Sequence, residues 1–164
     1  MNTEKFWGYI GGIIDGEGTV TSPYIRPSGS ITIVNADKKL LEKILEFLIK
    51  NGVRSYVNKR KSKEKLYYKE TFQLKINGWR NLKIIFNNCP ILIEEKRNRL
   101  EFIIRRGETK EKLKQDRIND FIKIKIDHPE YSLRKIARIL NENLSNILYR
   151  WGVKELLKKK ITID

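Results

Sequence analysis

Residues 7–18 read WGYIGGIIDGEG, and this stretch decides how the rest of the chain is organised. Apolar side chains three and four positions apart predict a helix with one buried face, and they are Phe6, Tyr9, Ile10, Ile13 and Ile14. Gly8, Gly12 and Gly16 recur every four residues and therefore share another face of that helix. Because glycine inside a helix costs about 1 kcal/mol relative to alanine, three glycines on one face favour the close approach of a second backbone.

The same stretch ends in two carboxylates, Asp15 and Glu17. Gly16 and Gly18 flank Glu17 and predict the end of the helix and a change of chain direction. Small residues at this spacing also occur in membrane helices, but this segment carries two acids and is too short to span a bilayer. The residues therefore predict a closely packed helix that presents an acid at its end.

Composition favours one soluble domain, or one domain with a small appendage, that binds nucleic acid. The 164 residues include 35 Lys and Arg against 20 Asp and Glu, a net charge of +15 that is spread along the chain. Neutralisation of phosphates supplies most of the nonspecific affinity for nucleic acid, so this is the leading class of partner. An anionic membrane surface and a rim of solubilising lysines are the simpler alternatives.

The chain has one cysteine, Cys89, and one histidine, His128. A disulfide framework and a cysteine zinc site within the chain are therefore excluded, as are nucleases of the HNH type, which need several histidines. His128 precedes a proline between two expected helices and is interpreted as a loop residue. The sequence shows no secretory signal and no transmembrane run. We expect an intracellular protein in the cytoplasm or an organelle, with no membrane partner and no small-molecule cofactor.

Downstream of Gly18 the hydrophobic pattern changes from helical to alternating. Residues 19–25 and 30–34 predict two strands joined by a turn, and residues 53–60 and 67–77 predict a second hairpin. Between the hairpins we expect a helix that is capped by Asp37 and stopped by Asn51 and Gly52. Residues 79–86 and 91–105 predict two more helices.

This order predicts one antiparallel sheet of four strands with the helices packed on a single face. Phe72, Leu74 and Ile76 should point inward, which sends the residues between them to the open face. A polar sheet face has a suitable width for the major groove, where base edges offer a full code of donors and acceptors.

The composition changes at Gly107, and we expect a core of residues 1–106 and an extension of residues 107–164. Residues 132–140 and 145–151 resemble a helix-turn-helix, with Ser132 and Ser145 as caps. The linking turn lacks the usual glycine and looks long. The extension is thus either a DNA-reading module or a helical extension that packs on the core.

Residues 10–18, IGGIIDGEG, resemble the LAGLIDADG motif of the homing endonucleases. They match it as an apolar residue, two small ones, two apolar ones, Asp, a small residue, an acid and Gly. Gly11 stands where alanine is usual, which should be harmless, and Glu17 stands where Asp is most frequent, although either can ligate a metal. The resemblance covers roughly residues 6–106. It implies an α+β fold with an αββαββα LAGLIDADG core, a DNA-binding four-stranded antiparallel sheet and a C-terminal helical extension.

A single motif with a glycine face argues for a homodimer in which two copies of the helix pack about a two-fold axis. The expected interface consists of Gly8, Gly12, Asp15 and Gly16, with Asp15 bonding the backbone at the tip of the partner's helix as the resemblance implies. Glu17 is then the metal ligand and a catalytic residue. The resemblance implies a Mg²⁺-dependent intron-homing endonuclease that makes a double-strand break in a long pseudo-palindromic DNA target, with Mn²⁺ or Ca²⁺ able to replace Mg²⁺ for binding.

Two further residues are catalytic candidates. Asn35 lies at the junction of a strand and a helix, and Lys96 lies on the last core helix, where it could stabilise the phosphate in the transition state. Their alternative interpretations are a turn residue and an exposed lysine. The candidate DNA-binding residues are Thr21, Arg26, Thr32, Lys59, Lys69, Thr71, Gln73 and Lys75. A non-catalytic DNA-binding regulator and an intron RNA maturase remain alternative functions, and the retained acid Glu17 argues against the regulator.

Overall fold

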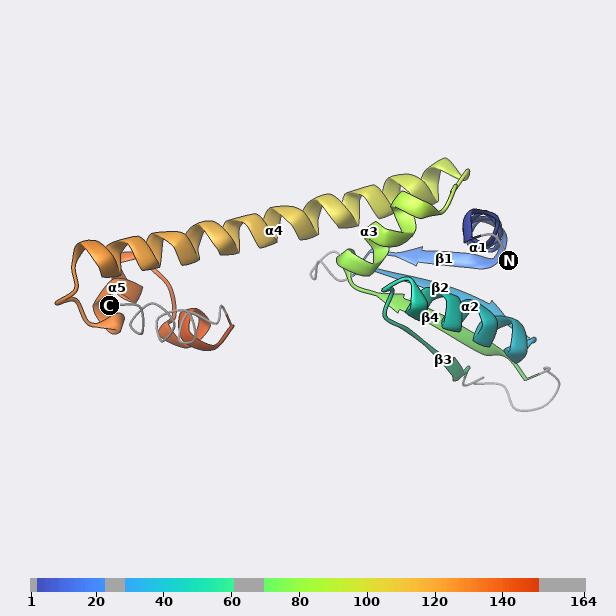
Figure 1. Ribbon diagram of the computed structural model, residues 1–164, viewed down its shortest axis with the longest axis horizontal. Helices are drawn as coiled ribbons and strands as arrows, with labels where there is room; N and C mark the ends of the chain where they lie inside the picture. Colours follow the sequence, from blue (N-terminus) through green and yellow to red (C-terminus); the bar gives the residue numbers. More distant parts are fainter. Residues whose placement is uncertain (1–2, 23–28, 61–69, 151–164) are drawn as a thin grey trace. The chain divides into compact units, whose positions relative to one another are not determined.

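The computed structural model describes residues 3–22, 29–60 and 70–150 (Figure 1). In chain order the elements are α1 (Thr3–Glu17), β1 (Gly18–Thr21), β2 (Ser30–Asn35), α2 (Lys38–Lys50), β3 (Ser55–Lys59), β4 (Phe72–Asn77), α3 (Trp79–Asn88), α4 (Glu94–Asp127), α5 (Leu133–Ile139) and a π-helical turn (Asn146–Arg150). The chain divides into two compact units, Met1–Gly107 and Glu108–Asp164. Each unit is described by itself.

The first unit contains one four-stranded antiparallel sheet in the order β1-β2-β4-β3. Inward side chains alternate along the strands, and the buried ones are Val20, Ile31, Ile33, Leu74 and Ile76. They form one core with buried residues of α1, α2, α3 and the beginning of α4. The αββαββα order and the antiparallel sheet predicted from the sequence are confirmed.

Capping residues set the ends of α2 as predicted. The Asp37 carboxylate accepts a hydrogen bond from the Leu40 amide at 3.1 Å, which satisfies one of the free N–H groups at the start of the helix. Asn51 is the C-cap, and Gly52 follows with a φ of +78°, a left-handed conformation that glycine adopts without strain. Residues 26–28 of the turn predicted at residues 26–29 lie outside the described residues.

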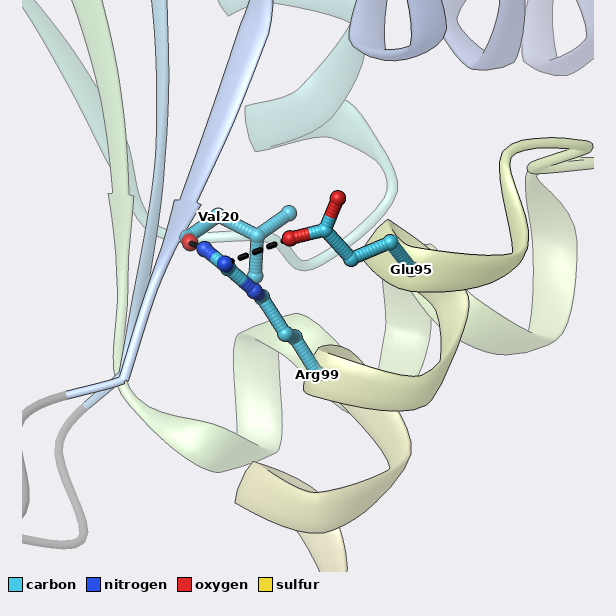
Figure 2. Close-up of polar contacts among 3 residues, drawn as sticks. All are labelled: Val20, Glu95 and Arg99. Atoms are coloured by element: carbon cyan, nitrogen blue, oxygen red, sulfur yellow. Dashed lines mark hydrogen bonds and ion pairs between the residues drawn. The ribbon is translucent and has the colours of Figure 1, made fainter.

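β1 lies at an edge of the sheet, and a side chain from α4 reaches its backbone (Figure 2). Arg99 Nη1 donates to the Val20 carbonyl oxygen at 3.3 Å, and Nη2 donates to Glu95 Oε1 at 2.5 Å. The Glu95 carboxylate, one helical turn before Arg99, thereby holds the guanidinium in place. This contact links α4 to the strand that directly follows the acidic end of α1.

α4 differs from the sequence-based expectation. The sequence predicts a helix that ends near residue 105, but α4 is continuous from Glu94 to Asp127. Residues 106–115 are rich in Glu and Lys, which are strong helix formers. Gly107 lies inside this helix and makes room for a neighbour, since a Cβ atom there would lie 2.2 Å from Trp79 Cγ.

The second unit has its own small core of Ile118, Phe121, Ile136, Ala137 and Ile147. Ser132 caps α5 as predicted, because its hydroxyl oxygen accepts from the Lys135 amide at 3.2 Å. The predicted cap at Ser145 is wrong. The Asn143 side chain accepts from the Ser145 amide at 2.8 Å, so the helical segment starts one residue before Ser145. Trp151 lies outside the described residues. Across those residues, none of the helices combines the length and hydropathy that a membrane span requires.

Candidate functional site

The end of α1 forms the centre of the candidate site. Trp7, Ile10 and Ile14 are buried on one side of this helix and anchor it in the core. Asp15 follows this anchored face and is half-buried, whereas Glu17 at the last helical position is exposed. The buried face therefore fixes a helix whose final carboxylate faces solvent.

Glu17 and Asn35, two predicted catalytic residues, are in direct contact. Asn35 Nδ2 donates to Glu17 Oε2 at 2.9 Å. Asn35 Oδ1 accepts from the Asp37 amide at 2.8 Å, which fixes the orientation of the side-chain amide. Asn35 is the last residue of β2 and shares the inward face with Ile31 and Ile33, and this position carries it to the end of α1.

Lys96, the third predicted catalytic residue, binds the carbonyl end of α1. Its ammonium group donates to the carbonyl oxygens of Ile14 at 2.8 Å and Asp15 at 2.7 Å. A positive charge at this position is favourable because the free carbonyls give the end of a helix partial negative charge. These two bonds use two of the three N–H donors of the ammonium group.

Asp15 binds the backbone just before the start of α4. Its Oδ2 accepts from the Leu92 amide at 2.7 Å and its Oδ1 from the Ile93 amide at 3.3 Å. Both amides lie directly before Glu94, where α4 begins and where N–H groups lack helical partners. Within the single chain the Asp15 carboxylate thus binds its own backbone, and the expected bond to a partner's helix stays a prediction.

The glycines of α1 have two kinds of surroundings. A Cβ atom added to Gly8, Gly12 or Gly16 would meet no atom within 4 Å. At Gly11 it would lie 2.8 Å from the Pro90 carbonyl oxygen. Glycine at this position therefore suits its surroundings, because a backbone group occupies the space that an alanine methyl would need. The other three glycines form an open face of the single chain.

The open face of the sheet carries most of the predicted DNA-binding residues. Thr32 pairs with Lys75 and Thr21 with Ser30 across neighbouring strands. Gln73 and Lys75 alternate with the buried residues of β4, and Thr71, which precedes β4, continues this alternation. Arg26 and Lys69 lie outside the described residues.

Lys59, another predicted DNA-binding residue, lies at the edge of the sheet. It pairs with Phe72 and forms an ion pair with Glu70. Val57, two residues earlier, pairs with buried Leu74, so Lys59 lies on the helix-facing side of the sheet edge. The sequence left the two faces of β3 undecided, and the register decides between them.

The register also adds residues to the open face that were not among the candidates. They are Thr19, Ser30, Tyr56, Asn58 and Asn77. Tyr56 is opposite Lys75, and its hydroxyl accepts from Asn77 Nδ2 at 3.4 Å. Their polar alternation was visible in the sequence, but only the pairing of β3 with β4 assigns Tyr56 and Asn58 to this face.

Comparison with known families settles the relationship of the chain. The family described as LAGLIDADG-like domain matches residues 7–90, more than half of the 164 residues. The chain belongs to this family. The match contains α1 from Trp7 to its acidic end, the whole sheet, α2 and α3.

The chain is also similar to proteins of known name or structure. The ATP-dependent DNA helicase Hel308 of Methanocaldococcus jannaschii is 28% identical over 113 residues, which are 64% of this chain and 9% of the helicase. The chain therefore spans less than a tenth of that relative.

Among solved structures, the homing endonuclease I-CvuI with its target is 16% identical, with a TM-score of 0.44, over 63% of this chain and 66% of that one. The archaeal intron-encoded homing endonuclease I-Vdi141I complexed with DNA is 16% identical, with a TM-score of 0.49, over 93% of this chain and 99% of that one.

Proposed function

We propose that this LAGLIDADG chain is a site-specific homing endonuclease that cuts both strands of a long pseudo-palindromic DNA target as a homodimer. The observation that carries the proposal is the exposed Glu17 carboxylate at the end of α1, held by Asn35 beside an open glycine face. The net charge of +15 favours a polyanionic substrate.

Dimerisation through α1 would complete the site. Space above Gly8, Gly12 and Gly16 allows the backbone of a second α1 to approach closely about a two-fold axis. In such an interface the same patch is used by both copies. The two Glu17 carboxylates, one from each chain, would then come close to the axis, and each would serve one DNA strand.

The residues present fit one half of a Mg²⁺ site. Within the described residues no group of three or more His, Cys, Asp or Glu side chains could hold a metal ion. Glu17 nevertheless offers the hard oxygen ligand that Mg²⁺ prefers, and Mg²⁺ commonly combines one or two carboxylates with substrate phosphates and water. Glu17 of both copies and the scissile phosphate would therefore hold the ion, with Mn²⁺ or Ca²⁺ able to replace it for binding. The bound ion would polarise the phosphate and help to deprotonate a water molecule.

Asn35 would orient the Glu17 carboxylate, and Lys96 would bind the scissile phosphate. Asn35 orients Glu17 through its amide, which is itself fixed by the Asp37 backbone. Lys96 holds the end of α1 with two donors, and its third donor is directed to a phosphate oxygen in this proposal. A cation there would stabilise the negative charge that develops during hydrolysis.

The open sheet face is proposed to lie in the major groove. Gln73 suits adenine and Lys75 suits guanine, whereas threonines bond bases or phosphates. Thr21, Thr32 and Thr71 share this face. Arg26 and Lys69 are proposed from the sequence alone as contacts to the DNA backbone.

A DNA-binding regulator without catalysis is the second candidate, because the second unit contains two short helices joined by a turn. An intron RNA maturase would use the same polar sheet for RNA. Glu17 favours the nuclease, since a regulator needs no exposed carboxylate at the end of α1.

Cleavage of a randomised pseudo-palindromic DNA library with Mg²⁺ tests the proposal. The variants are Glu17→Gln, which keeps the shape of the side chain, and Glu46→Gln, a control at an exposed acid of α2. We expect double-strand breaks with the wild type and the control and none with Glu17→Gln. A wild-type protein that binds specific DNA tightly but cuts no member of the library would refute the nuclease and favour the regulator.

A further inference from the structure

The second unit contains three helical segments around one core. The end of α4 contributes Ile118 and Phe121, α5 contributes Ile136 and Ala137, and the last described segment contributes Ile147. Lys125 closes the loop between α4 and α5 by donating to the carbonyl oxygens of Pro129 and Tyr131. Three helices packed in this way are the architecture of a helix-turn-helix module.

The turn between the last two segments has the geometry that this architecture needs. Asn141 takes a φ of +51°, the left-handed conformation that asparagine tolerates better than most residues. The Asn141 amide donates to the Arg138 carbonyl and the Glu142 amide to the Ala137 carbonyl, which together form a Schellman motif. Only Asn141, Glu142 and Asn143 separate the α5 C-cap from the next helical residue. The turn that looked long in the sequence is therefore short, and asparagine replaces the usual glycine.

The exposed side chains differ between the two segments. On α5 the exposed positions include three cationic side chains, Arg134, Lys135 and Arg138. Lys135 lies over the Tyr131 ring at 3.3 Å from its centroid, and Tyr131 stacks on His128, so this side of α5 is supported by ring contacts. The next segment begins with neutral hydrogen-bonding side chains, Asn143, Ser145 and half-exposed Asn146.

Glu142, the acidic residue of the turn, does not oppose an anionic partner. It forms an ion pair with Arg117 of α4, and its side chain is only 10% exposed. The negative charge of Glu142 is therefore paired, and the exposed surface stays basic on α5 and neutral on the segment after the turn.

We infer that the second unit is a helix-turn-helix module that binds duplex DNA, with α5 on the phosphates and the segment after the turn in the major groove. The exposed side chains of the two segments support this assignment. The cationic side chains of α5 suit phosphates, and the hydrogen-bonding side chains after the turn suit base edges. The inference rests on the proposed function only in its choice of duplex DNA as substrate. The module would extend the recognised sequence beyond the part that the sheet covers.

Salt-dependent binding tests the phosphate contacts. The probe is a random-sequence duplex of about 40 base pairs. Divalent metal is left out, so the result does not depend on cleavage. Each phosphate contact contributes about 0.9 to the slope of log affinity against log salt. The variant is the full chain with Arg134→Gln and Arg138→Gln, and the matched control has Lys110→Gln and Lys112→Gln on the exposed surface of α4. We expect the slope to fall by about 2 in the variant and to stay unchanged in the control.

A selection of preferred sequences from a random duplex pool tests the base contacts. Changing Ser145 and Asn146 to alanine should remove the preferences at one part of the selected site and leave the others. An unchanged salt slope in the arginine variant, or an unchanged set of preferences in the alanine variant, would overturn the inference. Equal binding of a duplex RNA of the same sequence would also overturn it, because side chains cannot read the narrow major groove of RNA. Failure of cleavage alone would contradict the nuclease proposal and leave this module standing.

Discussion

Two adjacent glycines of α1 should respond in opposite ways to the same substitution. Gly11→Ala and Gly12→Ala each add one methyl group to the same helix, and each gains about 1 kcal/mol of helix propensity. At Gly12 the new Cβ meets no atom within 4 Å, so the isolated chain keeps this gain. At Gly11 the Cβ would lie 2.8 Å from the Pro90 carbonyl oxygen and 3.2 Å from Pro90 Cδ.

Overfilling a packed site typically costs about 1–3 kcal/mol. Because the propensity gain is common to both variants, the difference between their free energies of unfolding equals this strain. We therefore expect Gly12→Ala to be more stable than Gly11→Ala by about 1–3 kcal/mol. Urea unfolding followed by tryptophan fluorescence measures the difference, at a concentration where sedimentation shows monomers, because self-association would add to apparent stability.

The same two variants test the proposed dimer. Gly12→Ala should raise the dimer dissociation constant by about tenfold or more, since each added methyl group in a close backbone contact costs over 1 kcal/mol. Equal unfolding midpoints for the two variants would refute the close approach of Pro90. Self-association of Gly12→Ala at wild-type strength, or a wild type that stays monomeric on DNA, would refute the glycine interface.

Three further outcomes follow from the site. Lys96→Met should lower the free energy of unfolding by about 2 kcal/mol, because two charge-assisted hydrogen bonds at the end of α1 are lost. The control Lys43→Met, at an exposed lysine, should change this free energy by less than about 0.5 kcal/mol. A Lys96→Met variant with wild-type stability but no cleavage would assign Lys96 to the DNA instead. Asn35→Ala should slow cleavage by about 10–100-fold, as expected for a residue that orients a metal ligand, and single-turnover rates check it. Burial raises the pKa of the Cys89 thiol from 9.0 to about 12. The folded chain should therefore resist alkylation by iodoacetamide at pH 8. Its free energy of unfolding should fall as the pH rises above 9, because the thiol ionises in the unfolded chain before it ionises in the folded one. Rapid labelling of the native protein would contradict the burial.

The sequence predicted the elements of the first unit because their patterns are local. Alternating residues in β2 and β4, the cap at Asp37 and the stop at Gly52 each act within a few positions, and the structure confirms them. The contact between Glu17 and Asn35 was harder to foresee, since 18 positions separate the two residues. The motif indicates Glu17 and the strand-to-helix junction indicates Asn35, but only the packing of α1 on β2 brings the two side chains together.

Long-range packing explains what the sequence could not predict. Gly11 and Gly12 look alike in the sequence, but Pro90 approaches only one of them. The register of β3 with β4, which places Lys59 opposite Phe72, could not be read from the sequence. Gly107 packs against Trp79, which lies 28 positions away in the chain. In each case the deciding neighbour is distant in sequence.

The bond between Arg99 and the Val20 carbonyl has a consequence for the solution behaviour of the protein. Strands at the edge of a sheet present unpaired backbone groups that can recruit strands from other molecules and start aggregation. A guanidinium already bonded to the β1 backbone makes that edge a poor template and adds positive charge beside it. The open, polar face of the sheet thus lies beside a β1 edge that a residue of α4 helps to protect.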